Sequence, residues 1–305
     1  MSQSNEVENR LKKRWRFLSK WSRKINVEYF RVYDRDIHQA PFIIDRIADG
    51  WIIWVCDNSF DDEELNAQIG EIKQILHDLE DGVFYFKDRR KSTDSNTGST
   101  DDQELTIHEG GLKFKIKPTQ YLDTGLFIDH RLLRAYIRNH SKKKRVLNLF
   151  AYTGSVSCYA LDGGASFVKS VDISPVYSKW HHDNCTLNQF DESKYGIVTR
   201  DCRKFLWENK ETFDLIFCDP PSFSQTKRNH LGYFQIQDHA GEIIDQCMNR
   251  LNEGGQLIFS TNYRKFKSEK AFDLNKYKVK ELTNQLCSKD FEGKWASRCW
   301  EIRST

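Results

Sequence analysis

The residues 219–223, Asp-Pro-Pro-Ser-Phe, directly follow the apolar run 215–218 and have the side chains best suited to chemistry. Two consecutive prolines fix φ and remove two N–H donors, so the turn is rigid and leaves carbonyl oxygens exposed. Phe223 can stack on a flipped-out nucleic-acid base, a contact worth roughly 1–3 kcal/mol. A purely structural turn with this sequence is conceivable, but few loops need such rigidity. We therefore predict a catalytic turn formed by Asp219, Pro220, Pro221 and Phe223.

A second candidate site follows the apolar run that ends at Phe150, where the chain continues as Ala-Tyr-Thr-Gly-Ser. Gly154 avoids a Cβ clash with a ligand, and the following helix presents free N–H groups. The turn matches neither G-x-G-x-x-G nor the phosphate loop G-x-x-x-x-G-K-[ST], which argues against a dinucleotide or a nucleoside triphosphate. Because many strands end in a glycine-bearing turn, this feature by itself is weak.

Two acids follow the next two apolar runs. Asp172 is placed to accept hydrogen bonds from the hydroxyls of a ribose, or to cap a helix that begins near Ser174. Asp201 can receive the exocyclic amine of adenine, or cap the helix after it. Together, the strand-end signals predict a site for a nucleoside-containing cofactor. The predicted contacts are Asn148, Phe150, Tyr152, Thr153, Gly154, Asp172, Ile173, Asp201, Cys202 and Asp219.

The elements that would position these residues alternate along the second part of the chain. Helical segments separate short apolar runs at 145–150, 166–173, 197–200, 215–218 and 256–261. This alternation predicts an α/β fold with a mostly parallel, doubly wound sheet over residues 119–305. Ligands of such sheets bind at the carboxyl ends of the strands, which is where the candidate residues lie.

Residues 1–118 are expected to form a smaller α+β unit in the order strand, strand, helix, strand, strand. An amphipathic basic helix at 9–24 comes first. The polar segment 89–103 is expected to be a mobile loop. The other predicted elements are a strand at 28–33, a bent or hairpin-like pair at 42–55, a helix at 61–79 and strands at 83–87 and 112–117.

Composition narrows the function classes. The chain has 305 residues, 38% of them hydrophobic, and a net charge of +3. Its eight cysteines have no zinc or redox spacing, so we expect reduced, mostly buried thiols and no metal. No window approaches the ~20 apolar residues of a membrane span, and the polar N-terminus suggests no secretory signal. We therefore expect a cytoplasmic protein without membrane contact.

The order of the strand-end motifs resembles that of a known family. Leu-Asn-Leu-Phe-Ala-Tyr-Thr-Gly at 147–154, Val-Asp-Ile-Ser at 171–174, Asp-Cys at 201–202 and the segment 219–223 are similar to the class I, Rossmann-like S-adenosylmethionine-dependent methyltransferases. The segment 121–131, Tyr-Leu-Asp-Thr-Gly-Leu-Phe-Ile-Asp-His-Arg, narrows the resemblance to methyltransferases of large-subunit (23S) ribosomal RNA. Within them, the chain most resembles the guanine-N7 methyltransferase half of the bifunctional K/L enzymes of bacteria, over nearly its whole length.

The resemblance implies S-adenosylmethionine as cofactor and large-subunit ribosomal RNA, or an assembly intermediate, as partner. It also implies that Thr124, Asp129 and Arg131 line the cofactor or active-site mouth. The bifunctional relatives have a further N-terminal half, with a second methyltransferase and an RNA-binding module, that has no counterpart in this sequence. Whether a partner supplies RNA targeting is therefore left open.

The methylated atom is predicted from the side chains available. Relatives that methylate cytosine C5 have a nucleophilic cysteine after the strand that here ends at Thr261, and none is present. Guanine N7 has a free lone pair and needs only orientation and electrostatics, which suits a site without an obvious His or Cys catalyst. We therefore predict guanine N7. Guanine N2 or adenine N6 stays open, because Asp219 could bind an exocyclic amine. His130 is expected to be structural more often than catalytic, and Asn262 is a candidate base contact.

The distribution of positive charge favours a polyanionic substrate. The basic helix can grip phosphates, although a solvated helix face would look the same. Loops after two strands add further cations on the predicted ligand side. The predicted RNA-binding residues are Arg10, Lys13, Arg14, Lys227, Arg228, Arg264 and Lys265. The alternatives are a methyltransferase of a small molecule or protein, and a non-catalytic RNA-binding assembly factor.

Overall fold

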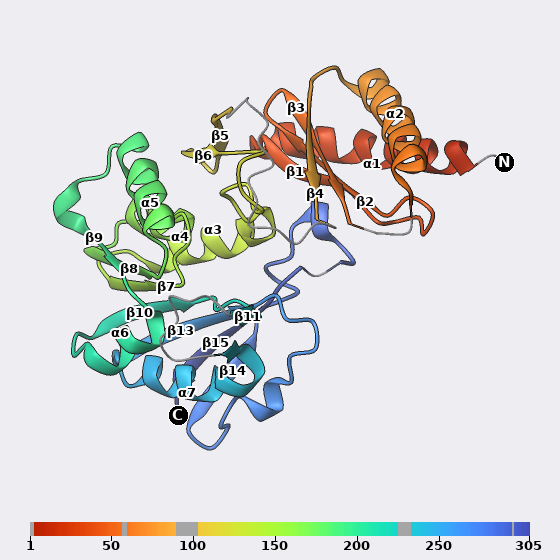
Figure 1. Cartoon of the computed structure of the whole chain (residues 1–305). Helices are drawn as coiled ribbons and strands as arrows, with labels where there is room; N and C mark the ends of the chain where they lie inside the picture. Colours follow the sequence, from red (N-terminus) through yellow and green to blue (C-terminus); the bar gives the residue numbers. More distant parts are fainter. Residues whose placement is uncertain (1–2, 57–59, 90–102, 225–232, 295) are drawn as a thin grey trace. The chain divides into compact units, whose positions relative to one another are not determined.

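The computed structural model describes residues 3–56, 60–89, 103–224, 233–294 and 296–305 (Figure 1). The chain divides into two compact units, Met1–Ile128 and Asp129–Thr305. The predicted boundary at 118/119 lies inside the first unit. The backbone N–H of Lys117 donates to the carbonyl oxygen of Thr124 over 2.9 Å, and the Lys87 ammonium donates to the carbonyl oxygen of Leu122 over 3.1 Å. These contacts hold residues 119–128 to the first unit.

The first unit contains a four-stranded sheet in the order β1-β2-β3-β4. Neighbouring strands are antiparallel from β1 to β3, whereas β3 and β4 are parallel and joined through a helix. The first helix begins six residues earlier than predicted and buries Leu11 and Leu18 against the sheet. This sheet and its helices are α1 (Gln3–Ile25), β1 (Tyr29–Asp34), β2 (Phe42–Ile47), β3 (Gly50–Val55), α2 (Asp62–Leu79) and β4 (Val83–Asp88).

A separate hairpin follows in the first unit, formed by β5 (Leu105–Glu109) and β6 (Leu112–Ile116). The sequence predicted only the second of these strands, as the last strand of the α+β unit rather than as part of a separate hairpin. The signal that was overlooked is the pair Gly110 and Gly111, whose φ values of 60° and 84° suit the tight turn of a two-residue hairpin. Most of the segment predicted as a mobile loop, 90–102, lies outside the described residues.

The second unit contains a seven-stranded sheet in the order β14-β15-β13-β10-β7-β8-β9. The five strands from β13 to β9 are parallel to one another, and β15 is antiparallel to both of its neighbours. The predicted mostly parallel, doubly wound sheet is thus confirmed. Its strands are β7 (Arg145–Leu149), β8 (Phe167–Asp172), β9 (Tyr195–Thr199), β10 (Phe213–Cys218), β13 (Leu251–Thr261), β14 (Tyr277–Glu281) and β15 (Arg298–Ser304).

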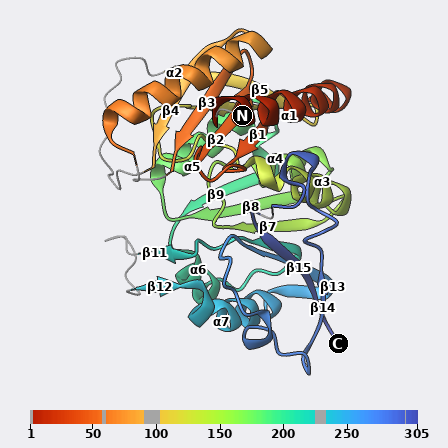
Figure 2. The same ribbon diagram turned by 90° about the vertical axis from the view of Figure 1, so that its right-hand side faces the viewer.

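Helices cover both faces of this sheet, with α3, α4 and α5 on one face and α6 and α7 on the other (Figures 1 and 2). The face under α6 and α7 is an apolar core that includes Phe205, Ile243 and Phe259. The helices are α3 (Arg131–His140), α4 (Ser155–Asp162), α5 (Pro175–Leu187), α6 (Cys202–Glu208) and α7 (Ile236–Met248). Short elements complete the unit: β11 (Phe223–Ser224), β12 (Phe234–Gln235) and the 3-10 turns η2 (Glu192–Lys194), η3 (Ser268–Lys270) and η4 (Lys289–Phe291), with η1 (Ile128–His130) at the junction.

The strand order defines where a ligand is expected. The chain proceeds outward from β7 through β8 to β9, and then returns to place β10 on the other side of β7. Such a reversal leaves a crevice at the carboxyl ends of the two central strands, the usual ligand site of a doubly wound sheet. Among the described helices, none is both long enough and apolar enough to cross a membrane.

Candidate active site

The turn after β7 has an unusual backbone. Phe150, Tyr152 and Gly154 have φ values of 55°, 50° and 75°, all in the left-handed region. A Cβ atom on Gly154 would lie 1.9 Å from Cδ2 of His181, a residue of α5. Because real Cβ contacts are never that short, the glycine lets the backbone lie directly against the imidazole ring. The predicted close approach at Gly154 is thus a feature of the fold, although the neighbour that requires it is protein.

Asp172, the last residue of β8, supports this turn. Its Oδ2 accepts the Tyr152 N–H over 2.9 Å, and its Oδ1 accepts the Ser174 N–H over 2.8 Å. The cap of α5 is Ser174, whose hydroxyl accepts the Tyr177 N–H, so Asp172 does not cap that helix. Burial raises the pKa of Asp172, and the two N–H donors lower it. Each carboxylate oxygen has a second lone pair, so the group can still accept the ribose hydroxyls of a cofactor.

Asp201 and Cys202 follow β9. Asp201 caps α6 by accepting the N–H groups of Arg203 and Lys204 over 2.9 and 3.1 Å, which is the alternative considered for it from sequence. Cys202 is 3% exposed, and its sulfur accepts the Phe150 N–H over 3.1 Å. The Cys202 thiol also donates to the carbonyl oxygen of Val171, and burial raises its pKa well above the usual range. The thiol therefore joins two ligand-side turns from within the protein.

Two further predicted contacts lie beneath the turn after β7. Asn148 is buried and its amide donates to the Ser157 hydroxyl over 2.8 Å, while its Oδ1 has no hydrogen-bond partner among the described residues. Thr153 is buried, and its carbonyl oxygen accepts the Asn184 amide over 2.9 Å. Ile173, the residue after Asp172, is half-buried. The side chains around this turn therefore mostly hold the backbone that would contact a cofactor.

The Pro-Pro turn leaves β10 beside the end of β7. Asp219 is partly buried, Pro220 is buried, and Phe223 is 50% exposed with its ring edge-to-face to Tyr263, centroids 5.5 Å apart. The Ser222 hydroxyl donates to the Asn262 amide oxygen over 2.6 Å. The turns after β10 and β13 thus form one surface with an exposed aromatic ring. Such a surface can stack a base.

A histidine lies next to Asp219. The Nδ1 atom of His130 is 3.7 Å from Asp219 Oδ2, and its Nε2 atom is 3.1 Å from the Ser297 hydroxyl. Burial raises the pKa of Asp219, while a protonated His130 and the Ser260 hydroxyl lower it. Asp129, predicted at the active-site mouth, lies 3.8 Å from His130 Nε2. The sequence predicts a site without an obvious histidine catalyst, and the structure places His130 next to Asp219.

The model of the S-adenosylmethionine-dependent methyltransferase family matches residues 81–272, which include both turns and Asp172. The chain belongs to this family. The resemblance noted in the sequence is thereby confirmed, and S-adenosylmethionine, which carries its methyl group on a sulfonium, is the cofactor. The turn after β7 and the lone pairs of Asp172 fit that nucleoside. Among the described residues, no group of three or more His, Cys, Asp or Glu side chains could hold a metal ion.

Curated proteins similar to this chain are named as methyltransferases of ribosomal RNA. The Ribosomal RNA large subunit methyltransferase K/L of Marinobacter nauticus is 36% identical over 310 residues, covering 97% of this chain and 42% of that protein. The protein of the same name from Pseudomonas syringae pv. tomato is 38% identical over 305 residues, covering 96% and 40%. The chain therefore spans less than half the length of these curated relatives.

Solved structures support the fold. A protein described as a methyltransferase, complexed with SAH, has a TM-score of 0.80 at 22% identity, covering 99% of this chain and 82% of that one. Trm5b of Pyrococcus abyssi has a TM-score of 0.56 at 17% identity, covering 84% and 73%.

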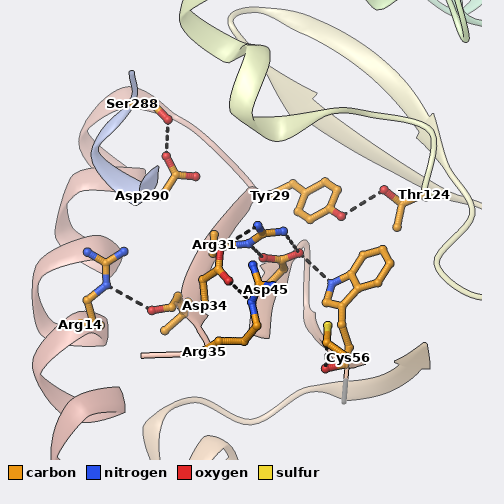
Figure 3. Close-up of polar contacts among 12 residues, drawn as sticks. Arg14, Tyr29, Arg31, Asp34, Arg35, Asp45, Cys56, Thr124, Ser288 and Asp290 are labelled. Atoms are coloured by element: carbon orange, nitrogen blue, oxygen red, sulfur yellow. Dashed lines mark hydrogen bonds and ion pairs between the residues drawn. The ribbon is translucent and has the colours of Figure 1, made fainter. Parts of the chain in front are cut away.

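Two other residues predicted at the active-site mouth have partners within their own units. In the first unit, the Thr124 hydroxyl lies 3.0 Å from the Tyr29 hydroxyl (Figure 3). In the second, Arg131 is 5% exposed and its Nη1 lies 3.0 Å from Oδ1 of Asp290. The Asp290 carboxylate also accepts the Ser288 hydroxyl (Figure 3). Arg131 thus ties the segment before β15 to the start of α3. No local sequence signal indicated this partner.

The methyltransferase presents only some of the predicted RNA-binding cations to solvent. Arg10 forms an ion pair with Asp36, and the Arg14 guanidinium donates to the carbonyl oxygen of Val32 over 3.2 Å. Lys13 on α1, and Arg264 and Lys265 after β13, are exposed. Lys227 and Arg228 lie outside the described residues.

Proposed function

We propose that this chain transfers a methyl group from S-adenosylmethionine to a guanine of large-subunit ribosomal RNA. The observation that carries the proposal is the surface at the carboxyl ends of β10 and β13. Asp219 follows β10 at the switch point of the sheet, and Phe223, further along the same turn, has an exposed ring packed edge-to-face on Tyr263. A carboxylate can accept N–H groups of a base whose face stacks on an aromatic ring. The names of the K/L relatives favour ribosomal RNA as the source of that base.

The cofactor would occupy the neighbouring turns. We assign the ribose hydroxyls to Asp172, the adenine to the side formed by Ile173 and the Asp201–Cys202 turn, and the amino-acid end to the turn around Gly154. Backbone N–H groups of these turns donate to Asp172 and Cys202, and the Asn184 amide donates to a backbone carbonyl oxygen. This arrangement directs the sulfonium methyl toward Asp219 at the end of the adjacent strand.

Guanine N7 is our choice of acceptor atom. In that reaction the bond between sulfur and methyl breaks, a bond from N7 to methyl forms, and the positive charge passes from sulfur to the guanine ring. No proton has to leave, so a fixed carboxylate that stabilises the developing charge is sufficient. Guanine N2 is the second candidate, and the proximity of His130 to Asp219 favours it, because methylation of an amine releases a proton that this pair could accept.

RNA binding would involve exposed cations. The side chains of Lys13, Arg16 and Lys20 on α1 are exposed, and Phe17 among them is 49% exposed. A cation contact to phosphate gives binding that weakens as salt increases. A ribosomal RNA substrate would also place the protein in the cytoplasm. A non-catalytic RNA-binding factor would use the same exposed cations but would have no need of Asp219.

The test uses labelled S-adenosylmethionine, protein-free large-subunit ribosomal RNA from a strain lacking the protein, and nucleoside mass spectrometry. We expect labelled N7-methylguanosine with the wild-type chain and none with Asp219→Ala. Asp191→Ala is the matched control, because that aspartate is exposed and caps the surface turn η2. Label in N2-methylguanosine would keep the enzyme and change the atom. Absence of label in any nucleoside, despite cofactor binding, would refute the proposal.

A further inference from the structure

Asp219 is part of a network of polar side chains from separate elements. The Ser260 hydroxyl at the end of β13 lies 3.4 Å from Nε2 of His130, and it lowers the pKa of Asp219. The same Nε2 atom is 3.1 Å from the Ser297 hydroxyl, just before β15. His130 is 7% exposed, and its ring lies edge-on to Phe217 with centroids 6.3 Å apart. The imidazole is therefore held in one orientation, with Nδ1 toward the carboxylate.

His130 is not oriented as a cap of the helix that follows it. His130 precedes α3 at the position of a helix cap, yet its side chain makes no capping hydrogen bond to that helix. Its polar neighbours include the two serines and the carboxylates of Asp129 and Asp219. The side chain is thus directed away from the helix that it precedes and toward the end of β10.

The charges around Asp219 determine how its neighbours, including the His130 imidazole, affect its ionisation. Asp129 disfavours the ionised form of Asp219, and the buried thiols of Cys218 and Cys299 are further titratable neighbours. Arg131, which follows His130 in the chain, forms an ion pair with Asp290. A protonated His130 lowers the pKa of Asp219 and so counteracts the effect of burial on that carboxylate. An opposite charge at this range favours the ionised form of a buried acid.

We propose that His130 is a positioning residue that keeps the Asp219 carboxylate ionised and correctly oriented for methyl transfer. The inference rests on the proposed function and deepens it. An ionised carboxylate accepts two or more N–H donors from the edge of a base, whereas a protonated one presents a donor of its own. Its negative charge also stabilises the cationic ring that N7 methylation produces. His130 acts through Asp219 and needs no contact with the substrate.

The test compares His130→Gln and His130→Asn with the wild type, and uses His140→Gln as the matched control. His140 lies at the far end of α3, where its Nδ1 is 2.8 Å from the Tyr136 carbonyl oxygen. We expect the His130 variants to bind S-adenosylmethionine as tightly as the wild type in calorimetry. At saturating cofactor, kcat on ribosomal RNA should fall about 10- to 100-fold, since a misplacement of about 1 Å at a reacting centre can cost roughly 100-fold. The acidic limb of the kcat profile should move to higher pH, because Asp219 loses its cationic neighbour.

A second measurement needs no activity. The carboxyl carbon of Asp219, labelled with 13C and followed by NMR, should titrate at higher pH in His130→Gln than in the wild type. An unchanged titration, or a variant with wild-type kcat and an unchanged acidic limb, would overturn the role of His130. Loss of cofactor affinity at unchanged kcat would also overturn it, since it would make His130 a cofactor contact. If the wild type itself labels no RNA, the proposed function fails, and the NMR titration still decides whether His130 controls Asp219.

Discussion

Replacing Gly154 with alanine should damage the cofactor turn through two separable effects. The residue has a φ of +75°, which costs an L-amino acid about 1–2 kcal/mol. The new Cβ would also lie 1.9 Å from Cδ2 and 2.2 Å from Cγ of His181, a side chain that is 1% exposed and cannot swing into solvent. Inserting a methyl group into such a packed site costs about 1–3 kcal/mol. The expected total is about 2–5 kcal/mol of unfolding free energy, with a loss of S-adenosylmethionine affinity.

Gly254 provides a control with nearly the same backbone. Its φ is +71°, but a Cβ added there would meet no atom within 4 Å. Gly254→Ala should therefore lose only about 1–2 kcal/mol, the cost of the left-handed conformation. The difference between the two variants isolates the collision with His181. Urea unfolding measures the stability of each variant, and titration calorimetry measures its affinity for S-adenosylmethionine.

A double-mutant cycle makes the reasoning refutable. With His181→Ala as background the collision is absent, so Gly154→Ala should cost about as much as Gly254→Ala. Residues in direct contact usually show coupling of about 0.5–3 kcal/mol. Equal losses for Gly154→Ala and Gly254→Ala in the wild-type background would refute the assignment, as would additive effects of the Gly154 and His181 substitutions.

Two other predictions concern the second unit, one about substrate binding and one about a buried ion pair. Phe223→Ala should raise KM for ribosomal RNA at nearly unchanged cofactor affinity, by the equivalent of about 1–3 kcal/mol of lost base stacking, while Phe223→Tyr should stay close to wild type; equal KM values for the alanine and wild-type enzymes would exclude stacking. Arg131→Met should destabilise the protein by about 3–5 kcal/mol in urea, because it strands the fully buried carboxylate of Asp290. Adding Asp290→Leu should restore much of that loss, and a double variant no more stable than Arg131→Met would contradict this account.

The parts predicted correctly from sequence are those with a local signal. The central strands are short apolar runs, and their ligand-side turns contain residues such as Gly154 and Asp172 whose types fit a strand end. β14 has no such signal, because only two of its five residues are even half-buried and it forms the sheet edge. β15 was missed because its place between β14 and β13 depends on pairing with strands distant in the chain. Edge strands with charged residues are common and avoid aggregation, but they resemble loops in sequence.

The side chains around Asp219 were unpredictable for the same reason. His130 and its partner Ser297 are 167 residues apart in the chain, so no motif can contain both. Arg131 matched a segment of the family and was expected near the ligand, yet its charge is used to hold Asp290. Sequence patterns therefore predicted the strand-end turns that we propose for the cofactor, where backbone conformation dominates, and did not reveal the contacts between distant side chains.

The contacts of His130 and Asp219, which the sequence did not reveal, affect the choice between guanine N7 and guanine N2 as the methylated atom. The sequence favours N7 partly because it contains no obvious histidine catalyst, and His130 next to Asp219 makes a proton acceptor pair for N2 conceivable as well. What still distinguishes the atoms is the proton: N7 methylation releases none, whereas methylation of the N2 amine must transfer one to an acceptor such as Asp219. Asp219→Asn keeps an oxygen that can accept a hydrogen bond but is neutral and a very poor base. If N7 is the acceptor, this variant should retain part of the activity lost in Asp219→Ala; for N2, it should be as inactive as the alanine variant.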